Sequence, residues 1–344
     1  MREAMYWEPV GGGAVRCGLC PHRCRIAEDA IGICGVRENR GGTLLASGYG
    51  QVSSIALDPI EKKPLYMFQP GKRVLSIGGF GCNLRCPFCQ NHEISMVYVD
   101  RAENPDNQEY TENKGNKGNK EIEKPDNKEV AISENPNRGS TMSERASKAG
   151  AGRRRRTRAD EGARRLSPDE IADLAVRTVP DGNIGIAYTY NEPLIGYEFL
   201  SDCAALVRGA GMCNVVVTNG FINSEPLERL LPFVDAMNID LKGLSKVFYR
   251  KLGGNPETVK ETIVLAHRHC HVEVTTLIIP DENEDDVAGL AQWLSSIDPA
   301  IPLHLSRFFP RYLYSDRYPT PGETVYRLRD TARKFLKNVF IGNM

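Results

Sequence analysis

Short apolar segments rich in β-branched residues alternate with amphipathic segments, and this alternation constrains the fold more than any other feature. The amphipathic stretches, such as 193–211 and 284–297, have helical periodicity. Strands that are apolar on both faces and separated by helices form parallel sheets covered on both sides. The sequence therefore predicts repeated βα units. The predicted strands occupy residues 74–78, 184–190, 214–219, 236–241, 271–279 and 302–308.

About six such units, with a further strand expected at 339–342, are typical of a partial or complete α/β barrel. A length of 344 residues suits one barrel with appendages. An open, doubly wound sheet would show the same periodicity, so this alternative stays open. In either architecture, ligands bind at the carboxyl ends of the strands.

The region from residue 99 to 165 differs from the rest of the chain because it is polar and contains an Asn-Lys-Gly repeat at 113–120. Such a stretch buries too little apolar surface to offset its ordering entropy, so we predict a disordered insertion. Its arginines at 153–156 suit nucleic acid or an acidic partner. A charge run in a flexible segment is more often simply solvated, so we do not expect nucleic-acid binding.

Regular structure is expected to resume with a helix that begins after Ser167. Pro168 at the first helical position and Glu170 three residues after the cap are start signals, and the helix is predicted to run through Ala175. We therefore expect three parts: a Cys-rich, metal-binding extension at 1–70, a barrel formed by 71–98 and 166–344, and the insertion at 99–165.

Charge and hydropathy exclude several functional classes. Lys plus Arg and Asp plus Glu number 44 each, so no global field favours nucleic acid or an anionic membrane. The chain has no apolar run of about 18 residues and no signal peptide at its start, so we expect a cytoplasmic protein without membrane association. In the reducing cytosol its ten cysteines indicate metal binding or catalysis rather than disulfides.

A glycine-rich loop after the first predicted barrel strand carries Cys82, Cys86 and Cys89. Three thiolates at this spacing can bind three irons of a cubane cluster and leave the fourth iron open. A closed zinc site would need a fourth protein ligand, for which His92 is a candidate. The spacing favours the cluster.

A second cysteine group lies near the N-terminus. Its four thiols can close a tetrahedral site that holds either structural zinc or an auxiliary iron–sulfur cluster. His22 lies inside this motif but is expected to be a bystander. Three isolated cysteines are expected to be small buried hydrophobic residues. The group consists of Cys17, Cys20, Cys24 and Cys34, and the isolated residues are Cys203, Cys213 and Cys270.

The Cys-x3-Cys-x2-Cys loop, with Phe88 before its last cysteine, resembles the signature of radical S-adenosylmethionine (SAM) enzymes of the pyruvate formate-lyase activase-like branch. The chain is similar to the AmmeMemoRadiSam-system radical enzymes over nearly all of its length except the insertion. It departs from that pattern at Met67, where histidine is expected, and at Met344, where many relatives continue. The similar segments are 58–66, 188–193, 215–221, 238–243, 272–280 and 302–312.

The resemblance implies a partial (βα)6 barrel of the radical SAM type, with a [4Fe–4S] cluster on Cys82, Cys86 and Cys89 and with SAM as the second cofactor. It implies that Glu192 and Asn191 hold the methionine amino group. The other implied cofactor contacts are Asp240 and Lys242 near the methionine moiety and ribose, Thr218, Asn219 and Gly220 in the same pocket, His304 near the adenosine, and Phe88 beside the adenine.

Each contact has a plainer interpretation: Glu192 before a proline could start a helix, and Asp240 with Lys242 could be an ordinary ion pair. Convergence of polar residues at one end of successive strands favours the functional interpretation of the set.

The implied reaction is reductive cleavage of SAM to methionine and a 5′-deoxyadenosyl radical, which abstracts hydrogen from an unknown substrate, with a protein or peptide favoured. The resemblance also implies an electron donor of the flavodoxin or ferredoxin type and Memo-like and AMMECR-like partners. Two alternatives stay open: a dedicated glycyl-radical activase, and a catalytically silent iron–sulfur or zinc interaction protein.

Overall fold

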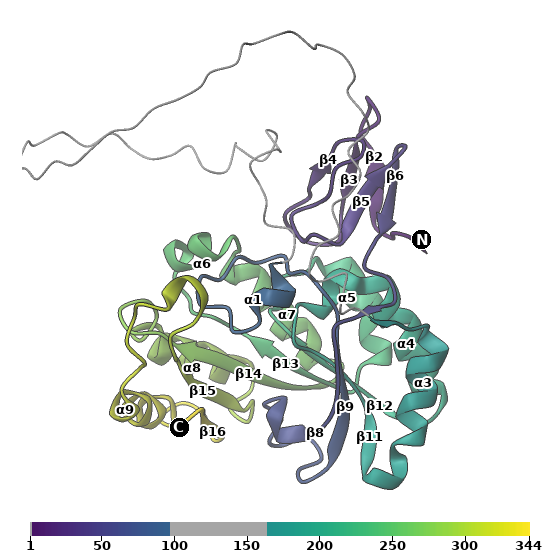
Figure 1. The fold of residues 1–344 in the computed structure, drawn as a ribbon. Coiled ribbons are helices and arrows are strands. Elements are labelled where there is room, and N and C mark those ends of the chain that lie inside the picture. The colour runs from purple at the N-terminus through teal and green to yellow at the C-terminus, as the bar shows by residue number, and fades with distance from the viewer. Residues whose placement is uncertain (1, 97–163) are drawn as a thin grey trace, which may run out of the picture. The chain divides into compact units, whose positions relative to one another are not determined.

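The structure is a computed structural model that describes residues 2–96 and 164–344. Its main element is an eight-stranded sheet in which every strand except β8 runs parallel to its neighbours (Figure 1). In spatial order the strands are β16 (Val339–Gly342), β15 (Leu303–Arg307), β14 (His271–Ile278), β13 (Ala236–Asp240), β12 (Cys213–Thr218), β11 (Asn183–Tyr188), β9 (Arg73–Gly78) and β8 (Ser54–Pro59).

The strand order decides between the two predicted architectures. From β9 to β16 the strands follow one another in space as they do in sequence, which is the single winding of a barrel rather than the reversed order of a doubly wound sheet. The two edge strands, β8 and β16, do not pair with each other, so the barrel is partial. The predicted fold class is confirmed, and the doubly wound alternative is wrong.

Helices connect the parallel strands and cover the outer face of the sheet (Figure 1). The predicted capping box is present: Ser167 accepts from the Glu170 amide, and the helix that follows ends at Arg177, two residues beyond the predicted end. The helices are α1 (His92–Ser95), α3 (Pro168–Arg177), α4 (Tyr197–Gly209), α5 (Ser224–Leu230), α6 (Lys246–Leu252), α7 (Pro256–His267), α8 (Asp286–Ile297) and α9 (Gly322–Ala332). Short 3-10 helices are η1 (Ile60–Lys62), η3 (Val179–Asp181), η4 (Pro193–Gly196), η5 (Leu231–Phe233) and η6 (Tyr312–Tyr314).

The loop between β8 and β9 packs against the inner face of the sheet. Its Ile60 and Leu65 are fully buried in one apolar cluster with β-strand residues that include Val74 and Ala236. The backbone amides of Tyr66 and Met67 donate to the Glu273 carboxylate on β14, at 3.0 and 2.7 Å. This loop therefore spans from one edge of the sheet to its middle. Met67 contributes its backbone amide to the contact with Glu273.

Small antiparallel sheets form the N-terminal part. The first is β2 (Trp7–Pro9), β3 (Val15–Cys17) and β4 (Arg25–Ile26), and the second is β1 (Arg2–Glu3), β6 (Thr43–Ala46) and β5 (Arg37–Arg40). A third pair joins β7 (Gln51–Val52) to β10 (Arg164–Arg165). The main sheet also takes in β8, which lies before the predicted barrel start at residue 71. The division into domains stays a prediction.

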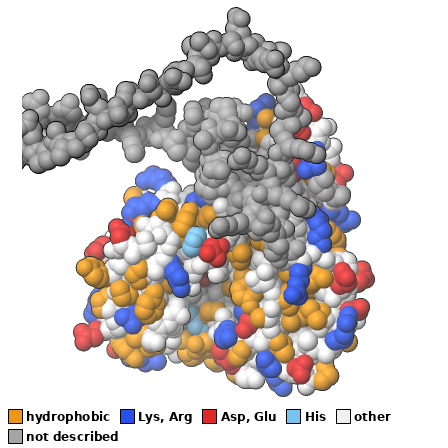
Figure 2. Space-filling view, viewed as in Figure 1, with side chains coloured by type: hydrophobic (Ala, Val, Ile, Leu, Met, Phe, Trp, Pro, Cys, Tyr) orange, Lys and Arg blue, Asp and Glu red, His pale blue; other side chains and the backbone are white. Residues whose placement is uncertain are grey.

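The predicted insertion lies outside the described residues except at its end, where Arg164 and Arg165 pair with β7. Disorder is a wrong prediction for these two residues, because backbone pairing supplies the ordering that their side chains do not. None of the helices that the structure describes is long and apolar enough to cross a membrane. Acidic, basic and apolar side chains are interspersed on the face drawn in Figure 2.

Candidate functional site

The loop after β9 brings Cys82, Cys86 and Cys89 together. Each of these thiols interacts electrostatically with the others, and none is in a disulfide. Burial raises the pKa of Cys86 to about 12 and also raises the pKa values of Cys82 and Cys89. Buried thiols of this kind ionise when a metal replaces the proton.

Donors around these sulfurs fit a thiolate-bound cluster. The amide of Leu84 and the side-chain amide of Asn219 donate to Cys82 Sγ at 3.4 and 3.6 Å. Over the described ranges, no three His, Cys, Asp or Glu side chains gather around one point as the ligands of a single ion do. In a cubane each thiolate binds its own iron, so three cysteines need not converge in that way. The three cysteines therefore fit a [4Fe–4S] cluster, and the candidate zinc ligand His92 stacks on Tyr312 instead, at 4.6 Å.

Glu192 lies in the loop after β11, just before η4, and is only 2% exposed. Its carboxylate accepts from the Thr218 hydroxyl and the Asn219 amide, both at 2.7 Å, and from the Leu194 amide at 3.0 Å. Burial raises the pKa of Glu192 to about 7 in spite of these hydrogen bonds. Its electrostatic interactions with Cys82 and Asp240 show that it faces the cluster loop. The ionised form of such a buried carboxyl group becomes favourable when a cation or an N–H donor binds beside it.

Asp240 and Lys242 form an ion pair of 2.6 Å after β13. The Lys242 ammonium and the Asp240 carboxylate both interact electrostatically with Cys86, so this pair also faces the cluster loop. Tyr249, which is fully buried on α6, accepts the Lys242 amide through its hydroxyl at 3.0 Å. Sequence reasoning missed Tyr249, because nothing in the pattern of α6 indicates which aromatic residue turns toward the site.

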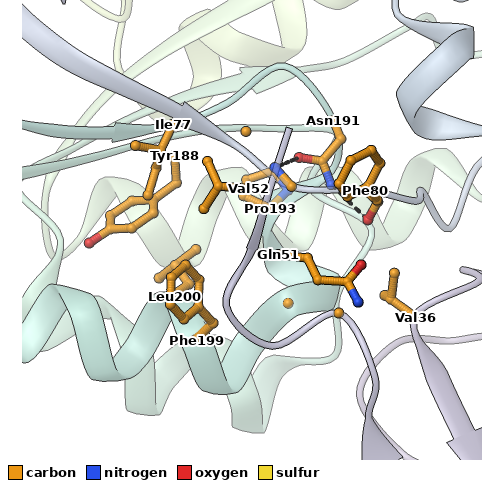
Figure 3. A pocket seen from close by; sticks show the side chains of 14 residues that line it. Val36, Gln51, Val52, Ile77, Phe80, Tyr188, Asn191, Pro193, Phe199 and Leu200 are labelled. Atoms are coloured by element: carbon orange, nitrogen blue, oxygen red, sulfur yellow. Dashed lines mark hydrogen bonds between the residues drawn. The ribbon is translucent and has the colours of Figure 1, made fainter. Parts of the chain in front are cut away.

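Asn191 lies beside Glu192, but its amide binds the backbone of the cluster loop. It accepts from the Gly79 amide at 2.9 Å and donates to the carbonyls of Phe80 and Gly81 at 3.1 Å. Figure 3 shows the contacts of Asn191 with Gly79 and Phe80 at the wall of a pocket that is lined mostly by apolar side chains. Asn191 therefore shapes the loop that carries the cysteines, and its predicted contact with the cofactor stays a prediction.

Asn219 and Gly220, which follow β12, make contacts within the protein. Asn219 donates to the Asn83 side chain at 2.9 Å, and Asn83 donates to the Phe221 carbonyl at 2.7 Å, which ties β12 to the cluster loop. Gly220 has φ +68°, and a Cβ there would stand 2.9 Å from Ile239. Its small size thus serves packing.

Phe88 is packed between two aromatic residues that the sequence did not single out. Its ring lies nearly parallel to Phe248 at 6.2 Å and tilted to Tyr314 at 5.9 Å. The Leu313 amide also donates to the Pro87 carbonyl at 2.9 Å, so the loop after β15 contacts the cluster loop.

His304 is buried on β15 and donates to Glu273 at 2.6 Å. Its ring meets Tyr66 edge-on at 4.8 Å and stacks on Phe340 at 5.3 Å. Burial opposes the charge of Glu273, but hydrogen bonds from His271, His304 and the two loop amides lower its pKa to about 2. His304 therefore belongs to the contacts that hold the β8–β9 loop, and its predicted place near the adenosine stays a prediction.

The four N-terminal cysteines line one small cavity together with His22 and Arg37. Cys20 interacts electrostatically with each of the other three thiols. His22 Nε2 donates to the Asn83 carbonyl at 2.7 Å, and its place outside the ligand set stays a prediction.

Comparison with known proteins supports the assignment. The sequence pattern of the Radical SAM superfamily matches residues 76–294. The chain is 38% identical over 350 residues to the uncharacterized protein MJ0808 of Methanocaldococcus jannaschii, covering all of this chain and 86% of that protein.

Solved structures with similar folds include a domain of the pyruvate formate-lyase-activating enzyme of Bacteroides vulgatus (18% identity, 46% of this chain and 98% of that one, TM-score 0.40). Another is SuiB of Streptococcus suis bound to S-adenosylmethionine (11% identity, 56% and 45%, TM-score 0.43). Because the family pattern spans the cysteine loop and most of the barrel, this chain belongs to the radical SAM superfamily, whose members are enzymes that use a [4Fe–4S] cluster and SAM for radical reactions.

Proposed function

We propose that this protein is an AmmeMemoRadiSam-type radical SAM enzyme that abstracts a hydrogen atom from a protein or peptide substrate. The observation that carries the proposal is the convergence of Glu192, Asp240 and Lys242 on the three-cysteine loop from the carboxyl ends of β11 and β13. A structural core does not require polar groups at that end of a barrel, whereas a barrel enzyme does.

In this proposal the chain's own residues bind and orient the cofactors. Cys82, Cys86 and Cys89 hold the cluster, and when bound and reduced the cluster and SAM together supply a 5′-deoxyadenosyl radical. Glu192 accepts hydrogen bonds from the amino group of SAM. Lys242, paired with Asp240, balances the negative charge of the thiolates.

The choice of a large substrate rests on the surface around the site, and the choice of partners rests on the family resemblance. Phe309, Leu313 and Tyr318 are exposed on the loop after β15, which contacts the cluster loop. Exposed apolar side chains beside a reactive site favour a large partner over a small metabolite. The family resemblance favours Memo-like and AMMECR-like partners, together with a flavodoxin or ferredoxin as reductant.

A dedicated glycyl-radical activase is the second enzyme candidate, supported by the resemblance of the cysteine loop to that of activases. It predicts hydrogen abstraction from a glycine Cα of a large partner, so a partner deuterated at glycine would transfer deuterium to 5′-deoxyadenosine. An interaction protein without chemistry is disfavoured, because it would not need Glu192, Asp240 and Lys242 beside the cysteines.

The first test is anaerobic reconstitution with iron and sulfide, followed by dithionite and SAM and an assay of 5′-deoxyadenosine. The wild type should form 5′-deoxyadenosine, and Cys86→Ala should not. The control variant Cys270→Ser, which changes a cysteine just before β14 and outside both cysteine groups, should match the wild type. Absence of product from a fully loaded wild type would overturn the proposal and favour the interaction protein.

A further inference from the structure

The N-terminal cysteines occupy one enclosed place in the fold although they come from separate segments. Cys17 ends β3, Cys20 and Cys24 lie on the turn that leads to β4, and the Cys17 amide donates to the Cys24 carbonyl at 3.0 Å. Cys34 comes from the next turn. All four are free thiols, and all four line the same cavity.

Several donors point at these sulfurs. The backbone amides of His22, Ile33 and Val36 hydrogen-bond to Cys20, Cys24 and Cys34, respectively. Amide–sulfur hydrogen bonds of this kind surround metal-bound thiolates, whose negative charge they stabilise.

A buried guanidinium adds positive charge. Arg37 is 1% exposed, its Nη1 donates to Cys17 Sγ at 3.5 Å, and its Nε has no hydrogen-bond partner among the described residues. Its charge is balanced by the buried carboxylate of Glu198, with which it forms an ion pair. Because Glu198 already neutralises this cation, its link to the cysteines is the Nη1 hydrogen bond, which stabilises a metal-bound thiolate at Cys17 more than a neutral thiol.

Contacts run from this group to both sides of Cys82. His22 donates to the carbonyl of Asn83, and the guanidinium of Arg85 donates to the carbonyl of Ile33. A Cβ on Gly81 would overlap the carbonyl oxygen of Cys34. The contacts thus pair residue 22 with 83, residue 33 with 85, and residue 34 with 81. The N-terminal cysteine turns therefore contact the cluster loop on both sides of Cys82.

We propose that Cys17, Cys20, Cys24 and Cys34 bind a second, thiophilic metal centre, and that this centre fixes the loop that carries Cys82. Four thiolates suit zinc or an iron–sulfur cluster. As with the cysteines of the barrel loop, these side chains do not converge on one point in the part of the chain that the structure describes, which a cubane cluster does not require and a single zinc ion does, so the cluster is favoured. The ligands are proposed from the cavity that the four cysteines share, and measurement of bound zinc and iron identifies the metal.

The metal is tested in a variant without the barrel-loop cysteines, Cys82→Ala/Cys86→Ala/Cys89→Ala. After purification it should hold about one zinc per chain, or after anaerobic reconstitution about four irons with iron–sulfur absorption. Adding Ser in place of all four N-terminal cysteines to this triple variant should abolish the metal, and adding Cys213→Ser to it should not. If the triple variant holds no more zinc or iron than a variant lacking all seven cysteines, the proposal is wrong, whether or not the wild type cleaves SAM.

The positioning role is tested by hydrogen exchange of residues 79–89. Loss of the N-terminal metal should speed amide exchange there by about tenfold, as expected when a buried hydrogen bond or two is lost. His22→Phe should keep the metal and still speed exchange, which covers the case in which the serine variant does not fold. Unchanged exchange in His22→Phe and in the metal-depleted wild type would refute the positioning role.

Discussion

Replacing Gly81 by alanine tests the packing of the N-terminal turns on the cluster loop. Gly81 has φ +82°, and a Cβ there would overlap the Cys34 carbonyl and stand 3.1 Å from Val36 and 3.2 Å from Ile195. Gly71 has nearly the same φ, +79°, and nothing within 4 Å of its added Cβ. Gly71→Ala therefore measures the backbone strain alone, about 1–2 kcal/mol. Gly81→Ala should lose a further 1–3 kcal/mol, roughly the cost of overpacking.

Urea unfolding of metal-free, reduced protein, followed by circular dichroism, measures both losses under conditions where bound metal does not complicate the transition. A second measurement compares the iron retained by the two reconstituted variants, which should be lower for Gly81→Ala. Equal losses of unfolding free energy in the two variants would refute the contact between Cys34 and Gly81, and with it the structural basis for coupling the two cysteine groups.

Three further changes test the polar contacts of the barrel. Because burial raises the pKa of Glu192 to about 7, the folded state binds more protons than the unfolded state between its ordinary pKa and 7, so the free energy of unfolding should fall as pH rises through this window. Glu192→Gln should flatten that slope in urea titrations at several pH values, and an unchanged slope would contradict the assignment. The pKa of Glu273 is lowered to about 2, so its stabilisation is present at neutral pH and lost as pH falls toward 2. Glu273→Gln should cost about 3 kcal/mol at pH 7 by the same assay, and a loss within error would show that the carboxylate does not anchor the β8–β9 loop. Tyr249→Phe removes the acceptor of the Lys242 amide and should cost about 1–3 kcal/mol in the same urea assay. A loss within error would show that this hydroxyl does not hold the Lys242 backbone.

The strands were predictable because a parallel sheet buried on both sides leaves continuous apolar runs. The run at 214–219 became β12 and the run at 271–279 became β14, each shifted by a residue at most. Strand order was not predictable, because periodicity records how each strand is buried and not which strand lies beside it. The consecutive order from β9 to β16 had to come from the structure.

The site was predictable where chemistry follows a strand directly, as with the cysteine loop after β9, Glu192 after β11 and Asp240 at the end of β13. Residues that reach the site across the fold were not, because helix positions such as those of Tyr249 and Phe248 look like ordinary core. The direction of the Asn191 amide was also hidden, since tertiary contacts decide which of several backbone groups it binds.

The antiparallel strand β8 has a consequence for how the protein behaves in concentrated solution. As the last strand of the sheet, it leaves one row of backbone groups without a partner strand in the described part of the chain, and such an edge can recruit a strand from another molecule. Two residues oppose this: Pro59 offers no amide to a neighbour, and Asp58 carries a charge that Lys63 holds at 2.9 Å. The opposite edge, β16, is only four residues long. Both edges of the barrel are thus built to resist strand-by-strand self-association.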